Sequence, residues 1–396
     1  MLTLFLTVFV DSVGFGIVLP LLPYLAQRYG ATPDVVTVLV AVFTASQFVF
    51  GPVWGRVSDR VGRRPILLIT IFGTMAGYAW LAFADSLVLI FIARAFSGAM
   101  GSNVAVVQAY VADITAPEHR ARGMGQIGAA HGLGFIAGPA IGGLFAGSDP
   151  ASPAFTVPFL IAAALSGIAF VMALVTVRES LAVEQRTQAG GAGGRIAAFL
   201  AAIARPRLGL LLGLLAMTPF AFSSIESTFV LWSERTLDWG PAQNGWVYSF
   251  MGMVAVVVQG LAVGRLTRRI GERRAILLGA ALAGAGALVL PFMAGYAGLC
   301  LAFGLVVSGV SINNPCLNSL ISRHAGAGER GSLLGVAQSC GALARIAGPL
   351  WGGFAFVTLG IDWPFWSATA MMAAMLVLAL RLPRGPHAAA AGARRP

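Results

Sequence analysis

The chain has 396 residues, of which 58% are hydrophobic and only 10% charged, and its mean hydropathy is +0.83. Soluble domains carry roughly 25% charged residues, so this composition excludes a soluble globular protein and indicates a polytopic membrane protein. The net charge of +11 could suit nucleic acid. However, most basic residues lie in short polar segments on one side of the predicted spans, as membrane topology requires.

Apolar windows of about 20 residues predict twelve membrane-spanning helices, in two sets of six. We therefore expect an all-α polytopic membrane protein with two pseudo-symmetric six-helix bundles, at 1–177 and 208–382. A cytoplasmic linker is expected at 178–207 and a cytoplasmic tail at 383–396. The expected helices are 2–27, 35–55, 65–84, 87–112, 122–146, 154–177, 208–232, 242–263, 274–294, 297–321, 331–357 and 363–381.

The first expected helix contains Asp11, which lies roughly 15 Å deep at 1.5 Å per residue and therefore near the midplane. Burial disfavours the ionised carboxyl and a nearby cation favours it, which suits a reversible proton carrier. The alternative is a packing carboxyl bonded to a Ser or Asn, but intramembrane charges are more often functional. No cleavable signal peptide is expected. Because no polar cytoplasmic segment precedes the first helix, we expect that the true start lies slightly upstream of Met1.

Between the second and third helices, residues 55–65 hold four arginines, one carboxylate and two glycines. Such a cluster cannot enter hydrocarbon, and its arginines place it on the cytoplasmic side. The segment 55–65 therefore predicts a tight turn, and a second copy occurs at 264–274. The defining residues of this cluster are Gly55, Asp59, Arg60, Gly62, Arg63 and Arg64, and a further carboxylate, Asp113, lies at the cytoplasmic end of the fourth helix.

Arg94 is the only charge inside the fourth helix, and its expected depth of roughly 18 Å from the cytoplasm matches that of Asp11. Because an arginine keeps its proton at any usable pH, we expect it to bias the carboxylate rather than carry the proton. A purely structural pairing is the alternative. Asp11 and Arg94 are therefore the candidate proton-coupling residues.

The fifth helix carries a segment at 136–143 that recurs at 346–353, which supports a six-helix duplication. Proline removes one internal hydrogen bond and glycine lets a neighbouring helix approach, so this segment predicts a kink with close packing. Generic helix packing is the alternative. The residues of this motif are Gly134, Gly138, Pro139, Gly142 and Gly143.

Glu226 and Arg345 form a second possible pair, on the seventh and eleventh helices, for an ion pair or for binding a substrate cation. An interface-exposed glutamate is the alternative. Other polar residues are candidate linings of a substrate cavity, because such sites need a few convergent polar groups. These candidates are Asn103, Gln108, Asn313, Asn314 and Gln338.

These residues resemble the major facilitator superfamily, and specifically its twelve-helix drug:proton antiporters. The segment 55–64 is similar to the family signature G-x-x-x-D-R-x-G-R-R, and this resemblance implies that its residues act with Asp113 as a conformational switch. The segment 132–143 resembles the antiporter signature. The opening helix, 11–23, resembles that of tetracycline-efflux and multidrug exporters. Where tetracycline exporters have a membrane histidine and a membrane aspartate, this chain has Ala255 and Ala283, which argues against tetracycline as the dedicated substrate.

The sequence therefore predicts a proton-coupled antiporter that exports drugs or other amphipathic small molecules by alternating access. A proton-coupled importer of sugars or metabolites is the alternative, and a non-transporting receptor or scaffold is a third hypothesis. No nucleophile–base arrangement, P-loop or zinc spacing is present, so no enzyme, cofactor or metal is expected. The expected partners are the substrate, protons and lipid, with no nucleic acid, and the monomer is expected to function. We expect the bacterial inner membrane, with both termini cytoplasmic.

Overall fold

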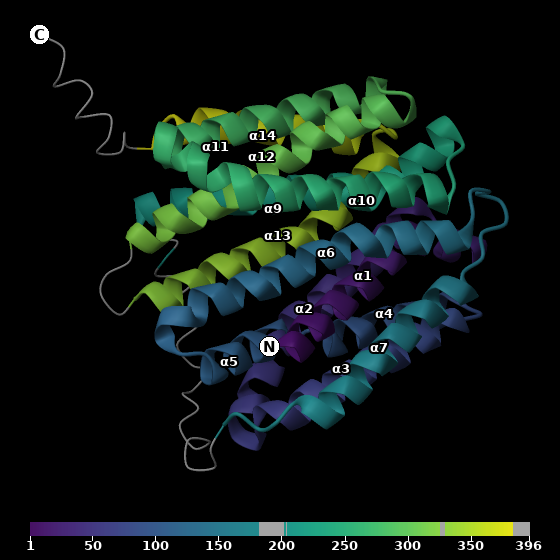
Figure 1. Cartoon of the computed structure of the whole chain (residues 1–396). Coiled ribbons are helices and arrows are strands. Elements are labelled where there is room, and N and C mark those ends of the chain that lie inside the picture. Colours follow the sequence, from purple (N-terminus) through teal and green to yellow (C-terminus); the bar gives the residue numbers. More distant parts are fainter. Residues whose placement is uncertain (182–201, 203, 325–328, 383–396) are drawn as a thin grey trace, which may run out of the picture. The chain divides into compact units, whose positions relative to one another are not determined.

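A computed structural model describes residues 1–181, 202, 204–324 and 329–382. The all-α expectation is confirmed, because no strand occurs among these described residues. The expected linker at 178–207 lies mostly outside them, and so does the expected tail at 383–396. The main helices are α1 Leu2–Arg28, α2 Pro33–Val61, α3 Arg63–Ala82, α4 Leu87–Met100, α5 Val104–Ile114, α6 Arg120–Ala146, α7 Thr156–Thr176, α9 Pro206–Leu237, α10 Pro241–Val257, α11 Val263–Val289, α12 Gly295–Arg323, α13 Arg330–Thr358 and α14 Trp363–Ala379 (Figure 1).

Ten helical segments of the described part are long and apolar enough to cross a membrane. One of them, Pro241–Phe292, is 52 residues long, which is enough for two crossings. It bends at Gly271, where φ is 78° and ψ is 160°. A shorter apolar helix, Trp363–Ala379, follows the last of the ten. The structure is therefore consistent with twelve crossings.

The chain forms two compact units that do not follow the sequence order strictly. The first unit comprises Met1–Gly190 with Phe229–Met253, and the second comprises Gly191–Thr228 with Val254–Pro396. Helix α9 is continuous and passes from the second unit into the first at Phe229. The division into the two expected bundles stays a prediction.

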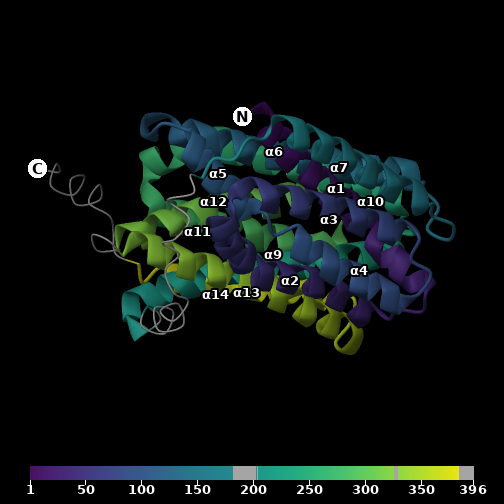
Figure 2. The same cartoon turned by 90° about the horizontal axis from the view of Figure 1, so that it is seen from below.

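In the first unit, α1 packs against α6 and α7, and α3 packs against α4 and α7 (Figure 2). The hairpin Phe229–Met253 is tied to α1 by hydrogen bonds. The Tyr24 hydroxyl donates to the Trp239 carbonyl at 2.5 Å and accepts from Asn244 Nδ2 at 2.9 Å. Gln27 Nε2 donates to Glu234 Oε2 at 2.7 Å. These bonds explain why the hairpin belongs to the first unit.

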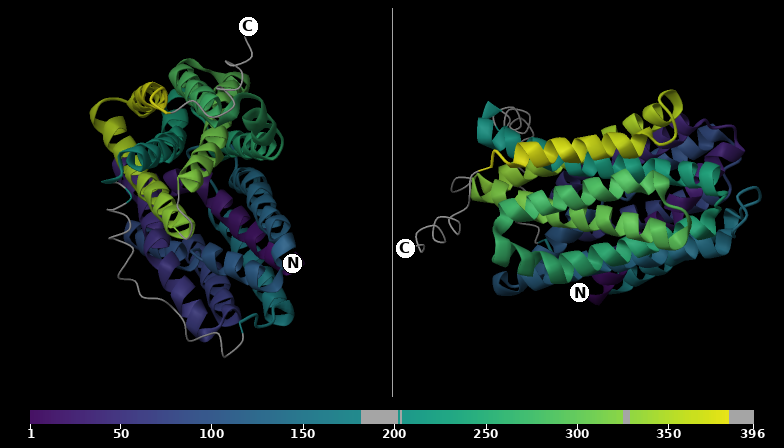
Figure 3. Two further views of the ribbon diagram at one scale, coloured as in Figure 1. Left: turned by 90° about the vertical axis from the view of Figure 1, so that its left-hand side faces the viewer. Right: turned by 90° about the horizontal axis from the view of Figure 1, so that it is seen from above.

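In the second unit, α11 packs against α12 and α14, and α13 packs against α12 and α14 (Figure 3). The duplication read from the sequence recurs in local structure. Gly62 and Gly271 both have positive φ, at 117° and 78°. The arginine two positions after each glycine donates to carbonyls that end a helix: Arg64 bonds Leu174 O at 2.9 Å, and Arg273 bonds Leu380 O at 2.7 Å. Both units therefore fasten a glycine turn in the same way.

One expected helix is broken, because 87–112 forms α4 and α5 with an interruption at Gly101–Asn103. Glycine, serine and asparagine all favour non-helical backbone over a helix interior. Ser102 Oγ donates to the Ala99 carbonyl at 2.5 Å, and Gln47 Nε2 donates to the Gly101 carbonyl at 3.4 Å. Non-helical backbone at membrane depth is tolerated only where protein or a cavity surrounds it. This break is next to Asp11.

Candidate functional site

Asp11 lies on α1 opposite the break between α4 and α5. Asn103, the last residue of the break, donates from Nδ2 to Asp11 Oδ2 at 2.8 Å. The other carboxyl oxygen, Oδ1, is buried and accepts no hydrogen bond from any described residue. A protonated carboxyl has one O–H donor, so Asp11 retains one oxygen that a proton can occupy while Asn103 holds the other.

Arg94 is 3% exposed and lies on α4, where its guanidinium carbon is 4.2 Å from the centre of the Phe43 ring. A cation over an aromatic face is stabilised by the ring quadrupole. No ion pair joins Arg94 to Asp11 within the described residues. Instead Tyr78, on α3, interacts electrostatically with both of them. Tyr78 is thus a common neighbour of the two charges, and their matched depth in the membrane stays a prediction.

The tyrosine fits there because Gly14 has no side chain. A Cβ on Gly14 would overlap the Tyr78 ring, including its hydroxyl oxygen at 2.6 Å. Gly14 lies three residues after Asp11 on the same helix. Tyr78 could not be predicted from the sequence, because an aromatic residue in an apolar helix usually packs against lipid or other helices.

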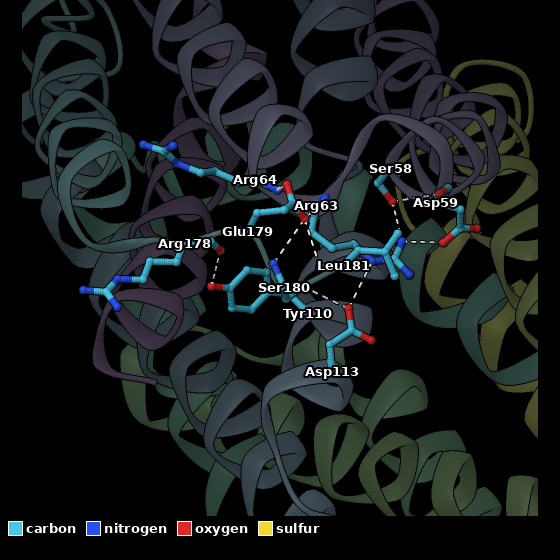
Figure 4. A network of polar contacts seen from close by, with 11 residues as sticks. Ser58, Asp59, Arg63, Arg64, Tyr110, Asp113, Arg178, Glu179, Ser180 and Leu181 are labelled. Atoms are coloured by element: carbon cyan, nitrogen blue, oxygen red, sulfur yellow. Dashed lines mark hydrogen bonds and ion pairs between the residues drawn. The ribbon is translucent and has the colours of Figure 1, made fainter. Parts of the chain in front are cut away.

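The expected turn 55–65 is wrong in its extent, because α2 continues to Val61, α3 begins at Arg63 and Gly62 alone separates them. Arg63, whose side chain is 10% exposed, organises the contacts around Gly62. Figure 4 shows these contacts. Arg63 Nη1 lies 2.5 Å from Asp59 Oδ1 and donates to Ser58 Oγ at 2.6 Å. Its Nε donates to Asp113 Oδ2 at 3.4 Å. The structure therefore brings together three of the expected switch residues, Asp59, Arg63 and Asp113. Arg60 is exposed, and Gly55 has open space around it.

Sequence reasoning missed Glu179, which follows α7 at the start of the expected linker. Its Oε1 accepts from the Arg63 backbone N–H at 2.8 Å, and its Oε2 accepts from that of Arg64 at 3.2 Å (Figure 4). These N–H groups begin α3, and a carboxylate at a helix N-terminus is stabilised there. A Cβ on Gly62 would overlap this carboxylate, so Gly62 is needed for space as well as for its φ of 117°.

We expect Glu179→Gln to lower the thermal stability of the purified protein, because a neutral amide caps a helix N-terminus less well. The usual contribution of about 0.3–1 kcal/mol at an exposed helix end corresponds to a fall of about 0.4–1.2 °C in the unfolding midpoint of a chain of this length. Glu118→Gln is the matched control, since Glu118 is an exposed carboxylate outside this network. Equal midpoints for the two variants would contradict the capping role.

The second unit has a related ion pair with its charges exchanged. Glu272 Oε1 lies 2.5 Å from Arg323 Nη2, so the acid follows the glycine of the turn and the arginine ends α12. In the first unit Arg63 follows the glycine and Asp113 lies near the end of α5. Both turns therefore have an ion pair at the residue after the glycine, but that residue is basic in the first unit and acidic in the second.

Among the expected cavity residues, Glu226 on α9 and Arg345 on α13 interact electrostatically, and their role as an ion pair or in binding a substrate cation stays a prediction. Asn313 is fully buried and lies 3.8 Å from Met375 Sδ. Asn314 is half-buried, whereas Gln108 and Gln338 are exposed. Of this group, only Asn103 contacts Asp11 directly. A role of the others in substrate binding stays a prediction.

The glycines of the expected helix-5 motif lie at two helix contacts. Gly134, Gly138 and Gly142 face the α1 backbone, where a Cβ on Gly138 would lie 2.5 Å from Val13 O and 2.8 Å from Gly16 Cα. Gly143 faces α10, where a Cβ would lie 2.6 Å from Pro241 O. Pro139 lies inside α6, which continues through it to Ala146. This motif therefore sets the distance of α6 from two neighbours.

Ala283, one of the two alanines that depart from the tetracycline pattern, is 2% exposed and packs against α12. A Cβ on Gly309 would lie 2.6 Å from its backbone nitrogen and 2.8 Å from its Cβ. Such close helix packing leaves no room for a longer side chain at this position without a shift. Ala255 is half-buried on α10.

Comparison with known proteins gives one consistent family. The model of the Major Facilitator Superfamily matches residues 4–349. The class E tetracycline resistance protein of Escherichia coli is 31% identical over 365 residues, covering 91% of this chain and 88% of that protein. The class G protein of Vibrio anguillarum is 32% identical, with 87% of each chain covered. Multidrug resistance protein 2 of Bacillus subtilis strain 168 is 28% identical, covering 92% and 90%.

A solved structure agrees with these sequence relatives. The crystal structure of the human organic anion transporter MFSD10 superposes with a TM-score of 0.70 at 25% identity, covering 95% of this chain and 98% of that one. The fold, the two glycine turns and the buried charges of the first unit are thus found in a chain similar to known transporters.

Proposed function

Since the chain belongs to the major facilitator superfamily and is therefore a membrane transporter rather than an enzyme, we propose that it is a proton-coupled antiporter that exports amphipathic small molecules. The observation that carries this proposal is Asp11, a membrane carboxyl with one oxygen held by Asn103, while no residue of the described part of the chain donates to the other. Loading and release of a proton at this group would couple each cycle to the proton gradient.

Arg94 would influence Asp11 electrostatically at longer range, with Tyr78 as a common neighbour, rather than through a direct ion pair. An arginine stays protonated at usable pH, so its charge is a fixed bias on the carboxyl. The absence of a salt bridge suits a carrier, because a tight ion pair would oppose protonation of the carboxylate. Asp11 is thus the residue whose charge changes and Arg94 the one whose charge stays.

Export of drugs is supported by the names of the relatives, which are tetracycline resistance and multidrug resistance proteins. Bacterial tetracycline-resistance relatives also support a place in the bacterial inner membrane. In this proposal the two six-helix bundles, 1–177 and 208–382, alternate in opening to each side, with the linker 178–207 and both termini in the cytoplasm. Two Arg-anchored glycine turns, one in each unit, suit an assembly that moves as rigid bundles.

Accumulation of a fluorescent dye in cells tests the function. Cells that express the protein should hold less dye than cells with an empty vector, and an uncoupler should remove that difference because it removes the proton gradient. A difference that survives the uncoupler would refute proton coupling. Equal dye levels without uncoupler, across a panel of cationic and neutral dyes, would refute drug export.

A further inference from the structure

His131 is a second titratable side chain that is bonded to α1 beside Asp11. It lies on α6, and its Nδ1 is 2.8 Å from the hydroxyl oxygen of Ser12, the residue that follows Asp11. Residues 11 and 12 of α1 are therefore held from two sides, by Asn103 and by His131. An ionisable residue inside a membrane segment is more often functional than structural. The proposed cycle uses Asp11 and assigns nothing to His131.

The hydrogen bonds of Ser12 determine which nitrogen of the neutral His131 ring carries the hydrogen. The Ser12 hydroxyl donates to the Val8 carbonyl at 2.8 Å, so its single hydrogen is already in use. The imidazole must then donate from Nδ1 to the Ser12 oxygen, which leaves Nε2 as the nitrogen that can accept a proton. In the imidazolium both nitrogens carry hydrogen. His131 can therefore gain and lose a proton at Nε2 without breaking its bond to α1.

The exposed edge of His131 lies on the side of α6 that faces other helices. Leu133 and Leu144, which are 44% and 64% exposed, lie about 140–160° around the helix from it. Gly134 and Gly138, whose added Cβ atoms would meet the backbone of α1, lie within about 60° of it. His131 is nevertheless exposed. Its ring is therefore accessible from the protein side of α6 rather than from the face that carries the exposed leucines.

The face of α6 next to His131 is covered at one end only. A Cβ on Gly143 would lie 2.6 Å from the Pro241 carbonyl of α10. Gly125 precedes Gly143 by about five turns and so lies on the same face. A Cβ on Gly125 or on Gly128 would nevertheless meet no heavy atom of the described residues within 4 Å. Water can therefore reach His131 from the end at which α6 begins, which is expected to be cytoplasmic.

Asp11 and His131 are the two groups of this region whose charge can change near neutral pH. The described segments that contact α6 are α1, α5, α7, α10 and the turn Pro117–His119 before it. Their other charged side chains lie at or near helix ends, and their phenols ionise well above neutral pH. These other titratable and charged residues, with those of α6 itself, are Tyr24, Arg28, Tyr110, Asp113, Glu118, His119, Arg120, Arg122 and Tyr248.

We propose that His131 is a second proton-binding residue of the transport cycle, beside Asp11. A proton from the outer medium binds the Nε2 lone pair and converts the ring to imidazolium. The same proton leaves Nε2 on the cytoplasmic side and restores the neutral ring. Because His131 is bonded to the residue next to Asp11, the movement that exposes Asp11 to either side exposes the imidazole as well. This inference rests on the proposed proton-coupled export and adds a second proton to each cycle.

Proton counting in liposomes tests the second site. The probe is ethidium, whose entry is followed with DNA trapped in an acidic interior, while trapped pyranine reports proton efflux in parallel samples. Valinomycin with equal potassium on both sides holds the membrane voltage at zero. The initial ratio of protons to ethidium should be about twice as large for the wild type as for His131→Asn, which lacks one of the two titratable groups. Asparagine keeps an amide donor for the Ser12 oxygen.

His119→Asn is the matched control, because His119 is exposed and precedes α6. Its ratio of protons to ethidium should equal that of the wild type. Equal ratios for the wild type and His131→Asn would overturn the second site while leaving proton-coupled export intact. Ethidium entry without any proton efflux in the wild type would instead refute the proposed function.

Nuclear magnetic resonance of isotope-labelled histidine in the detergent-purified protein tests the site without transport. The chain has four histidines, and the signal that His131→Asn lacks is that of His131. An antiporter exchanges substrate for protons, so saturating ethidium should lower the titration midpoint of His131 by about one pH unit, the scale of a typical coupling between two ligands. The His119 midpoint should not move. A His131 ring that stays neutral down to about pH 5, or a midpoint that ethidium leaves unchanged, would overturn the proposal.

Discussion

Replacing Asp11 with asparagine should abolish proton-driven export while leaving the protein folded and able to bind substrate. Asparagine keeps the size of the side chain, and its amide oxygen can still accept the bond from Asn103 Nδ2, but it cannot take up and release a proton. We expect the initial rate of uphill dye transport in energised vesicles to fall by ~100-fold or more, the scale of a positioned proton-transfer group.

Asp85→Asn is the matched control, because Asp85 is an exposed carboxylate between α3 and α4. This variant should transport like the wild type. Downhill exchange of dye for dye should persist in Asp11→Asn vesicles, since exchange needs no net proton movement. Uphill export at the wild-type rate by the Asp11→Asn protein would refute the assignment of Asp11 as the proton carrier.

Gly138→Val should prevent α6 from packing against α1. A Cβ at this position would meet the Val13 carbonyl and the Gly16 backbone, and neither can move aside without shifting a helix. Overpacking of this kind costs about 1–3 kcal/mol or more, and two kilocalories change the ratio of folded to unfolded protein by roughly 30-fold. The yield of monodisperse protein after size-exclusion chromatography should therefore fall sharply.

Gly128→Val provides the comparison on the same helix, because a Cβ there meets no heavy atom within 4 Å. Both substitutions replace a glycine of α6 with valine, so the change in helix propensity is the same in the two variants. A normal yield for Gly128→Val and a low yield for Gly138→Val would assign the loss to the α1 contact. Equal yields would show that Gly138 does not set the packing of α6 against α1.

The membrane spans and the two turns could be predicted from the sequence because their physical causes are local. Runs of apolar residues mark each span, and a cluster of arginines with glycines cannot lie anywhere but at a surface. Gly271 interrupts α11 inside the predicted second turn, and Gly62 separates α2 from α3 inside the first. Both glycines have positive φ, a conformation that other residues rarely adopt.

The contacts of the site could not be predicted, because they depend on which helices are neighbours. Asp11 was found as a lone membrane carboxyl, but its partner Asn103 required the break at Gly101–Asn103, which an apolar window does not reveal. Arg94 was expected to act on Asp11, whereas the structure places its guanidinium over the Phe43 ring. A sequence cannot separate a ring that packs between helices from one that faces lipid.

Glu179 was missed for a different reason. It lies in a polar stretch that reads as a linker, and its role arises from proximity to the start of α3, more than 110 positions earlier. One signal was available. Glu179 is one of only 15 acidic residues, and it directly follows the last predicted helix of the first set. An acid next to a membrane helix near an arginine-rich turn is worth testing as its cap.

Purified protein in liposomes, with an acidic interior and no ATP, tests proton-coupled antiport most directly. Because antiport is reversible, protein in either orientation should drive dye inward while protons leave, so dye should rise above its external concentration as the internal pH rises. An uncoupler added beforehand should stop both changes, and Asp11→Asn protein should show neither. Dye accumulation without proton efflux, or accumulation that persists after the pH gradient has collapsed, would contradict the account.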